Sequence, residues 1–458
     1  MTISGYNATT NHPSYRSTYM GLGAYYNPVY TEDAEPVSGS NGLGLGGAYP
    51  ATNIGKIDWT YANGYGDAGS VFRAGNSLAI NSVTKKFWAS GANDKGQLGI
   101  GNTNNTNIWS APLNAISANL YNGSYTERDP FSQGMPYSHM SMTHKTAVLW
   151  TKSGVFGWGD NSLGQLSAAN TVGAQDEGGY GTTLTRPYEL VDNNGDTFAN
   201  YASHPSSLPA DAIMQVGASR NAVFLLQRNG DVIARGHPIF GSSHSTWTTV
   251  ATNVGMMSIS TFAYFFVKKD GSVTSYGGIT PGQHSSLGAG LCSGTVDSSG
   301  NVVRTTSETE IIPSSERIVQ VSASPTHALF VKEDGTLLGL GQNDNYQFGN
   351  NNTTYLKTPT SIPFTASSLG VKHAYAFSGV SVVTTTHRHG QTNVTNNSHS
   401  AAPGFNNYEG FGDDVYSAGN NRYHQAGHVD RDPATGARIT FAETANDVKV
   451  WTAMSIYG

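Results

Sequence analysis

The sequence predicts an all-β protein, a β-propeller of about seven four-stranded blades, or alternatively six, with loop insertions. Three observations lead to this prediction: a hairpin pattern that occurs four times, a recurring Gly-rich segment, and a composition poor in charged residues. The chain has 458 residues, of which 55 are Gly and only 12% are charged. Long surface helices depend on Lys, Glu, Arg and Ala, whereas many short strands joined by Gly-containing turns indicate an all-β fold.

Four segments share an apolar run, a turn that contains Gly, and a second short strand. They are residues 147–155, 222–232, 263–273 and 328–337. Asn-Gly or Asp-Gly occupies the turn in three of them, which is a strong hairpin signal because Gly accepts positive φ. The apolar runs are nearly continuous, which predicts strands buried on both faces. A further short strand is expected ahead of three hairpins, at 213–216, 256–259 and 318–321.

A Gly-rich segment recurs along the chain, clearly at 91–99, 157–166 and 339–349 and in worn form at 276–290 and 418–427. No Gly-Lys-Ser/Thr follows any of these segments, so they are interpreted as tight turns between strands and not as phosphate-binding loops. Gly164 and Gly349 are expected to need positive φ. The hairpin glycines at 154, 230, 271 and 335 lie 76, 41 and 64 residues apart. Such a repeat with variable insertions is typical of a propeller.

Two of the Gly-rich segments, Gly157–Leu166 and Gly91–Gly99, resemble the signature of the regulator of chromosome condensation (RCC1)-like repeat. Ala74–Ile80 and Thr326–Phe330 are similar to the strand that precedes it in that family. The resemblance covers roughly residues 70–458 and implies about seven four-stranded blades. Six units can be counted from the loops. A seventh would be split between the chain ends, with an opening strand within Val448–Ile456 pairing with an N-terminal segment to close the ring.

Two regions are expected: a propeller over residues 51–458 and a Gly- and Tyr-rich N-terminal arm over residues 1–50. The arm would contribute to ring closure, dock on a neighbour or wrap the propeller, or else be a leader with little order. Insertions into the propeller are expected at 102–139, 167–211 and 378–410.

Charge and hydropathy exclude several classes of partner. The net charge is −6 and there is no Lys/Arg run, so no nucleic-acid partner is predicted. No stretch approaches the ~18 consecutive apolar residues that span a bilayer, so no membrane insertion is expected. The first residues lack the pattern of a secretory signal peptide. Cys292 is the single cysteine, which excludes an internal disulfide.

The sequence predicts no enzyme, no cofactor, and no catalytic, cofactor-binding or metal-binding residues. No Gly-X-Ser-X-Gly elbow is present, and no pattern near Cys292 would activate its thiol. His387 and His389 leave one question open. Alternate residues of a strand point the same way, so the two imidazoles would be able to share a metal ion. The polar residues at 391–399 favour instead an ordinary loop.

The predicted function is a non-catalytic binding or structural protein. Low charge with abundant Gly, Asn, Ser, Thr and Tyr favours a virion surface component, such as a phage tail, fibre or capsid-surface protein. Its partners would be neighbouring virion proteins, a host receptor or a glycan, and variable loops on a rigid ring would carry the contacts. The alternative is a cytoplasmic propeller scaffold for protein–protein interaction. Less favoured is a guanine-nucleotide exchange factor for a small GTPase, which the RCC1-like resemblance implies.

Overall fold

All four predicted hairpins form, and each becomes the middle of an antiparallel sheet. In this computed structural model the described residues are 57–64, 75–81, 87–116, 127–128, 139–143, 145–151, 154–166, 183–198, 209–219, 221–236, 244–261, 263–278, 291–366, 370–377, 379–385, 415–419 and 447–453. Within them, each of six sheets contains four strands in meander order, in which each strand pairs with the next along the chain. We call each sheet a blade.

The first blade consists of β1 (Ile57–Gly64), β2 (Gly75–Asn81), β3 (Phe87–Gly91) and β4 (Thr106–Ser110). The second consists of β7 (His139–Met142), β8 (Thr146–Thr151), β9 (Gly154–Asp160) and β10 (Thr183–Glu189). Its outer edge carries two further short strands, β5 (Ala115–Ile116) and β6 (Glu127–Arg128). β5 lies parallel to β10, with Ile116 opposite Tyr188.

The remaining blades have four strands each. The third consists of β11 (Ile213–Ala218), β12 (Ala222–Gln227), β13 (Val232–Gly236) and β14 (His244–Ala251). The fourth consists of β15 (Val254–Ile259), β16 (Ala263–Lys268), β17 (Val273–Gly277) and β18 (Thr305–Ile312). The fifth consists of β19 (Ile318–Ala323), β20 (His327–Lys332), β21 (Leu337–Gly341) and β22 (Leu356–Ile362). The sixth consists of β23 (Val371–Phe377), β24 (Val380–Thr385), β25 (Val415–Gly419) and β26 (Val448–Ala453).

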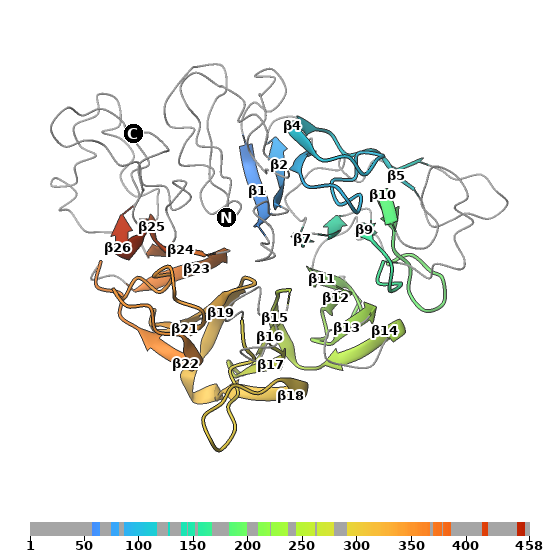
Figure 1. The fold of residues 1–458 in the computed structure, drawn as a ribbon. Coiled ribbons are helices and arrows are strands. Elements are labelled where there is room, and N and C mark those ends of the chain that lie inside the picture. The colour runs from blue at the N-terminus through green and yellow to red at the C-terminus, as the bar shows by residue number, and fades with distance from the viewer. Residues whose placement is uncertain are drawn as a thin grey trace, which may run out of the picture.

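The blades lie around a common centre, with their first strands nearest to it and their fourth strands at the periphery (Figure 1). This arrangement is that of a β-propeller, as the repeat predicts. Two ends of the propeller can be distinguished. The hairpin face carries the turns between second and third strands, which include Gly230, Gly271 and Gly335. The loop face carries the Gly-rich loops 92–99, 161–166 and 342–349 that follow the third strands.

The turn glycines behave as predicted, since φ is +68° at Gly164 and +56° at Gly349. The predicted role of Val448–Ile456 is wrong. Val448–Ala453 is the outer strand of the sixth blade and pairs with β25; it opens no blade. The predicted N-terminal arm and any ring closure through it lie outside the described residues. The described chain therefore contains six blades and leaves a seventh as a prediction.

The three predicted insertions also need correction, because each contains a blade strand. Residues 102–139 include β4, residues 167–211 include β10, and residues 378–410 include β24. β4 and β10 are outer strands of mixed polarity, with the sequences TNIWS and TLTRPYE. Outer strands bury less apolar surface than middle strands, so they lack the apolar run by which the hairpins were recognised.

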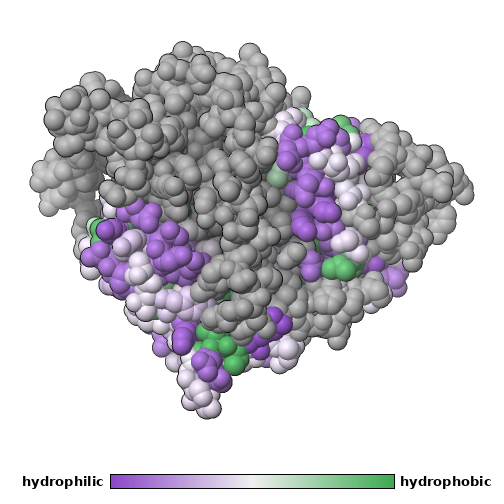
Figure 2. All heavy atoms as spheres, in the orientation of Figure 1, coloured by the Kyte–Doolittle hydropathy of each residue, from purple (hydrophilic) through white to green (hydrophobic). Residues whose placement is uncertain are grey.

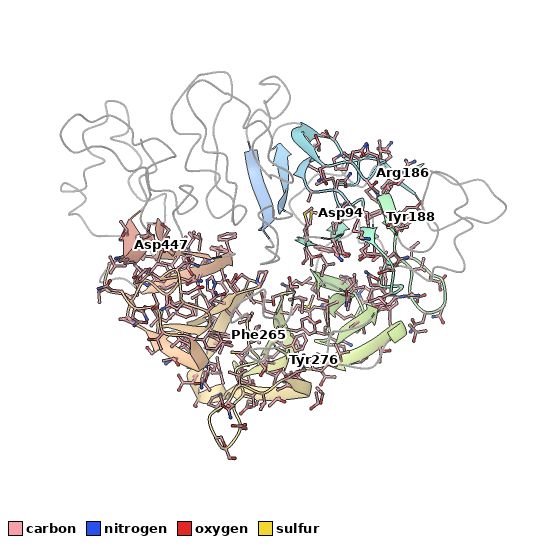
Figure 3. The ribbon with its side chains drawn as sticks, viewed as in Figure 1. Asp94, Arg186, Tyr188, Phe265, Tyr276 and Asp447 are labelled. Carbon is pink, nitrogen blue, oxygen red and sulfur yellow. The ribbon has the colours of Figure 1, made fainter. Side chains whose placement is uncertain are left out.

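Apolar side chains from both faces of the middle strands pack between the blades. All residues of β16 except Lys268 are buried, and β12 and β20 show the same pattern. The Phe265 ring of the fourth blade, which Figure 3 labels, meets the Phe330 ring of the fifth edge to face, with centroids 5.5 Å apart. Between the third and fourth blades, the Phe224 and Tyr264 rings lie 4.6 Å apart. Aromatic packing of this kind supplies much of the burial energy between sheets.

Side chains also join the inner strands of neighbouring blades by hydrogen bonds. The Gln215 amide donates to Met257 O (2.6 Å) and accepts from Met257 N (2.9 Å). Gln320 forms the same pair with Ala374 of the next blade, at 3.0 Å each. A side-chain amide thus satisfies two backbone groups on the strand edge that faces the centre. We call this arrangement the glutamine clasp.

The glutamine clasp is absent between the fourth and fifth blades, because Met256 occupies the position of Gln215 and Gln320. Val321 holds the same register position as Met257 and Ala374. We expect Met256→Gln to raise the free energy of unfolding by about 1 kcal/mol, because it adds two hydrogen bonds. The reverse change, Gln320→Met, should lower it by about 1–3 kcal/mol, because it leaves two backbone groups unpaired.

Urea unfolding of the two variants beside the unsubstituted protein measures these changes. Met and Gln have similar size, so each variant is a control for the packing effect of the other. A midpoint that moves in the same direction in both variants would show that the glutamine clasp does not govern this interface.

Candidate functional site

The inner strands carry a β-bulge at one recurring position. In β11, Ile213 and Gln215 pair with adjacent residues of β12, so Met214 between them is the extra residue. The same register shift makes Gly255 and Val319 the extra residues of β15 and β19. Asp58 of β1 and Lys372 of β23 hold the same place. A bulge turns a side chain away from the ladder, and five of the six described inner strands contain one.

These bulges lie at the hairpin face, because each begins opposite the end of the second strand. Met214 is 43% exposed and Val319 is 53% exposed, which is unusual for apolar residues on strands next to the core. Gly255 of the blade between them adds no side chain. The inner strands of the third and fifth blades therefore each present an exposed apolar side chain on the hairpin face.

The turns of the third to fifth blades bring charged and polar side chains to the same face. Arg317 pairs with Glu333 (3.0 Å) and Lys332 pairs with Glu316 (3.0 Å). Lys269 Nζ donates to Asn229 O (2.6 Å), which ties the turns of the third and fourth blades. Such exposed pairs contribute little to stability. Exposed apolar side chains on the same face as polar ones are, however, a feature of protein–protein interfaces.

Hydrogen bonds hold the turns of the hairpin face in place. Val254 N donates to Gly230 O (2.8 Å), Ile318 N to Gly271 O (2.9 Å) and Val371 N to Gly335 O (2.9 Å). Each turn is therefore bonded to the start of the next inner strand, next to its bulge. A Cβ at Gly271 would lie 2.9 Å from Arg317 Cα, which explains why the turn needs Gly. The face is thus a preformed surface built on rigid strands.

The Gly-rich loops have a structural role that their geometry explains. Asn93, Asn161 and Asn343 each accept, through Oδ1, a hydrogen bond of 2.9 Å from the backbone N–H five residues ahead. The side-chain oxygens of Gln97, Gln165 and Gln347 accept from a second backbone N–H in the same loop. Backbone N–H groups of the kind that bind phosphate are therefore already hydrogen-bonded to side chains of the same loop.

The loops also join neighbouring blades. Trp158 of the second blade donates from Nε1 to Gln97 O of the first (2.8 Å), and Arg235 of the third donates from Nε to Gly164 O of the second (3.0 Å). In the same way, Arg186 donates to Asn114 O (2.9 Å), which holds the segment before β5 near β10 (Figure 3). In Figure 2, mostly hydrophilic residues cover the described surface on the side that it shows.

His327 is a titratable residue that lies between the fifth and sixth blades. It is fully buried, and its Nε2 lies 2.7 Å from Ser381 Oγ of the sixth blade. Its Nδ1 lies 3.2 Å from Ser324 Oγ and 3.1 Å from Thr326 Oγ1. Burial lowers the pKa of His327 to about 3. The imidazole is therefore neutral at physiological pH and joins two blades.

Of the candidate reactive residues in the sequence, the structure describes Cys292. His387 and His389 lie outside the described residues, so a shared metal ion there stays a hypothesis. Cys292 is buried, and burial raises the pKa of its thiol, which disfavours the thiolate. Among the described residues, no group of three His, Cys, Asp or Glu residues is placed to hold a metal ion. No helix in this part of the chain is long and apolar enough to cross a membrane.

Sequence reasoning missed both the bulges and the His327–Ser381 contact. A signal for the bulges does exist: an apolar residue follows Ile at 213–214 and again at 318–319, ahead of Gln-Val in both strands. Two consecutive apolar residues break the alternation of a half-buried strand. No sequence signal places Ser381 near His327, because the pairing depends on how the two blades pack.

Replacing Gly349 should destabilise the protein. A Cβ at this position would lie 2.8 Å from the Trp451 ring, and φ is +56°. Gly349→Ala should therefore cost more than the ~1–2 kcal/mol of left-handed backbone alone. Gly300→Ala is the matched control, because Gly300 has φ +75° with no atom within 4 Å of the added Cβ. If chemical unfolding showed that both variants lose the same free energy of unfolding, contact with Trp451 would not matter for stability.

Acid should weaken the protein through His327. The folded-state pKa of about 3 lies below the ordinary value of 6.5, so the unfolded chain binds a proton first as the pH falls. The stabilising contribution is complete above pH ~6.5 and is lost toward pH ~3, by up to ~1.4 kcal/mol per pH unit. His327→Gln removes this pH dependence. The difference in the free energy of unfolding between this variant and the unsubstituted protein should therefore shrink as the pH falls.

Urea midpoints measured at pH values between about 7 and 5 give this difference. Ser381→Ala is the control, because it removes a hydrogen-bond partner and retains the titrating imidazole. A pH-independent difference between His327→Gln and the unsubstituted protein would contradict the assignment.

The comparisons with known proteins identify the fold. No known protein family and no curated protein matches the sequence. Among solved structures, Prp20p from Saccharomyces cerevisiae matches with a TM-score of 0.53 and 15% identity, over 99% of this chain and 85% of that one. Yeast RCC1 (Prp20) bound to Kap60 matches with a TM-score of 0.50 and 15% identity, over 87% of this chain and 74% of that one.

Human WBSCR16 matches with a TM-score of 0.50 and 14% identity, over 84% of this chain and 87% of the human chain. At these identities the likeness concerns the fold alone. The chain has the fold of the RCC1-like β-propellers, which confirms the resemblance found in its Gly-rich segments.

Proposed function

We propose that this chain is a non-catalytic β-propeller that binds another protein through its hairpin face. The observation that carries the proposal is the repeated β-bulge of the inner strands. It leaves Met214 and Val319 exposed on that face, which also carries the charged side chains of the turns. Apolar anchors near the middle of a polar surface are where the energy of protein–protein binding concentrates.

The solved structures support protein binding as a use of this fold. Yeast Prp20 has been crystallised bound to Kap60, and a second study of Prp20p concerns its binding to Gsp1p and histones. Fold alone does not establish function, so the surface is inferred here from this chain's own residues.

These matches favour the intracellular scaffold over the virion surface protein that the composition suggested. Composition remains the only support for the virion role. Guanine-nucleotide exchange would be one special form of the proposed protein binding, in which the partner is a small GTPase.

A double substitution tests the proposed face. Met214→Glu with Val319→Glu places two carboxylates where apolar anchors would be desolvated. We expect each to weaken binding by about 2 kcal/mol or more, which is roughly 30-fold. Proteins that co-purify with the tagged full chain from its cells of origin would be identified by mass spectrometry, and their affinity measured by calorimetry.

Leu163→Glu is the matched control, because Leu163 lies on the loop face and is 42% exposed. Partner loss with Leu163→Glu and retention with the double variant would move the binding site to the loop face. Co-sedimentation with virus particles would instead restore the virion role. Thermal unfolding of each variant establishes that the fold is intact.

A further inference from the structure

A small hairpin at the rim of the propeller, residues 191–197, follows β10. Val191 pairs with Thr197, and Asp192 Oδ1 accepts hydrogen bonds from Asn194 N (2.8 Å) and Asp196 N (2.9 Å). Gly195 has φ +88°. Residues 193–196 are all exposed. We call this segment the rim hairpin.

The rim hairpin connects the second blade with the third. Asn193 Nδ2 donates to Trp247 O (2.9 Å), and Asn193 Oδ1 accepts from Trp247 N (2.7 Å), so one side chain satisfies both backbone groups of Trp247 on β14. Trp247 Nε1 donates to Val191 O (2.7 Å). The Phe198 ring packs edge to face on the Trp247 ring at 5.4 Å. The position of Asn193 at the tip therefore determines how the edge of β14 is covered.

Asn194 precedes Gly195, and an Asn-Gly peptide is chemically labile. The backbone nitrogen after Asn can attack the side-chain carbonyl carbon, and Gly offers no side chain that would hinder the approach. No atom lies within 4 Å of a Cβ built on Gly195. Two hydrogen bonds oppose the attack, and both are long. Gly195 N donates to Asp192 O (3.3 Å), and Asn194 Nδ2 donates to Asp192 Oδ2 (3.4 Å).

The chain contains an internal comparison at Asn229 and Gly230. There, Gly230 N donates to Gln227 O at 2.9 Å. Asn229 is held at both ends by Asp231, with Nδ2 2.7 Å from Oδ2 and Oδ1 2.9 Å from the backbone N. The same dipeptide is thus firmly held in one turn and loosely held in the other.

We propose that Asn194 is a site of spontaneous deamidation that loosens the contact between the second and third blades. Gly195 N attacks Asn194 Cγ, a C–N bond forms, the bond from Cγ to Nδ2 breaks, and ammonia leaves with the proton from Gly195 N. Water then opens the cyclic imide at either carbonyl, which yields aspartate or isoaspartate. No oxidant or reductant takes part.

Both products disturb the rim hairpin. Either one places a third carboxylate on a turn that already has Asp192 and Asp196, and like charges at this distance repel. Isoaspartate also adds a methylene group to the backbone between positions 194 and 195. Each change displaces the adjacent Asn193 from Trp247.

A second hairpin provides the design of the control variant. In residues 296–302, Asp297 Oδ1 accepts from Ser299 N and Asn301 N at 2.9 Å each, which repeats the turn of the rim hairpin. Ser299 holds the position of Asn194. Serine is therefore compatible with this turn and has no amide to lose.

The experiment incubates the full chain at mildly alkaline pH and follows each amide by peptide mass mapping, with the urea-unfolded chain as the reference. In the folded chain we expect amide loss and ammonia release at Asn194, with Asn229 intact, whereas the unfolded chain reacts at both. Asn194→Ser should show no change at position 194 and should keep the starting melting temperature. The aged unsubstituted protein should melt lower.

If Asn194 kept its side-chain amide as long as Asn229 does in the folded chain, Asn194 would not be a site of deamidation. Amide loss without a change in melting temperature or in protease cleavage near residue 194 would overturn the proposed loosening. Asn194→Asp, which carries the added charge from the start, separates the effect of charge from that of isoaspartate.

Discussion

The fold depends on the burial of sheets that are apolar on both faces. β12, β16 and β20 have hardly a polar residue in their middle, so neither face of their blades can be left in water. At about 25 cal/mol per Å² of apolar surface, an isolated blade would be strongly disfavoured. Each blade is therefore stabilised by packing against its neighbours, and this packing is the condition for every other feature.

Packing alone would let the blades slide past one another, and polar side chains fix their register. Gln215, Gln320 and several serines of the inner strands reach the next strand and bond its backbone. The bulge works together with this arrangement. Because one extra residue precedes the Gln, the strand can turn Met214 or Val319 to solvent and still direct the Gln toward its neighbour.

The sequence was sufficient for the repeated parts of the fold and insufficient for contacts between repeats. Asn229-Gly230 and the apolar run before it identify a hairpin because turn and strand chemistry are local. The outer strand β10 escaped notice because Thr183–Glu189 has no apolar run and lies within a long polar segment. The contact of His327 with Ser381 and the exposure of Val319 could not be predicted, since both depend on how one blade meets the next.

The inner strands also differ from blade to blade, so the blades are not equivalent to a binding partner. A ring of identical blades would offer a partner several equivalent rotations about its axis. Here the bulge residues of the third, fourth and fifth blades are Met214, Gly255 and Val319, and the β7–β8 pair has no register shift. A partner rotated by one blade would therefore meet a different side chain at the same place.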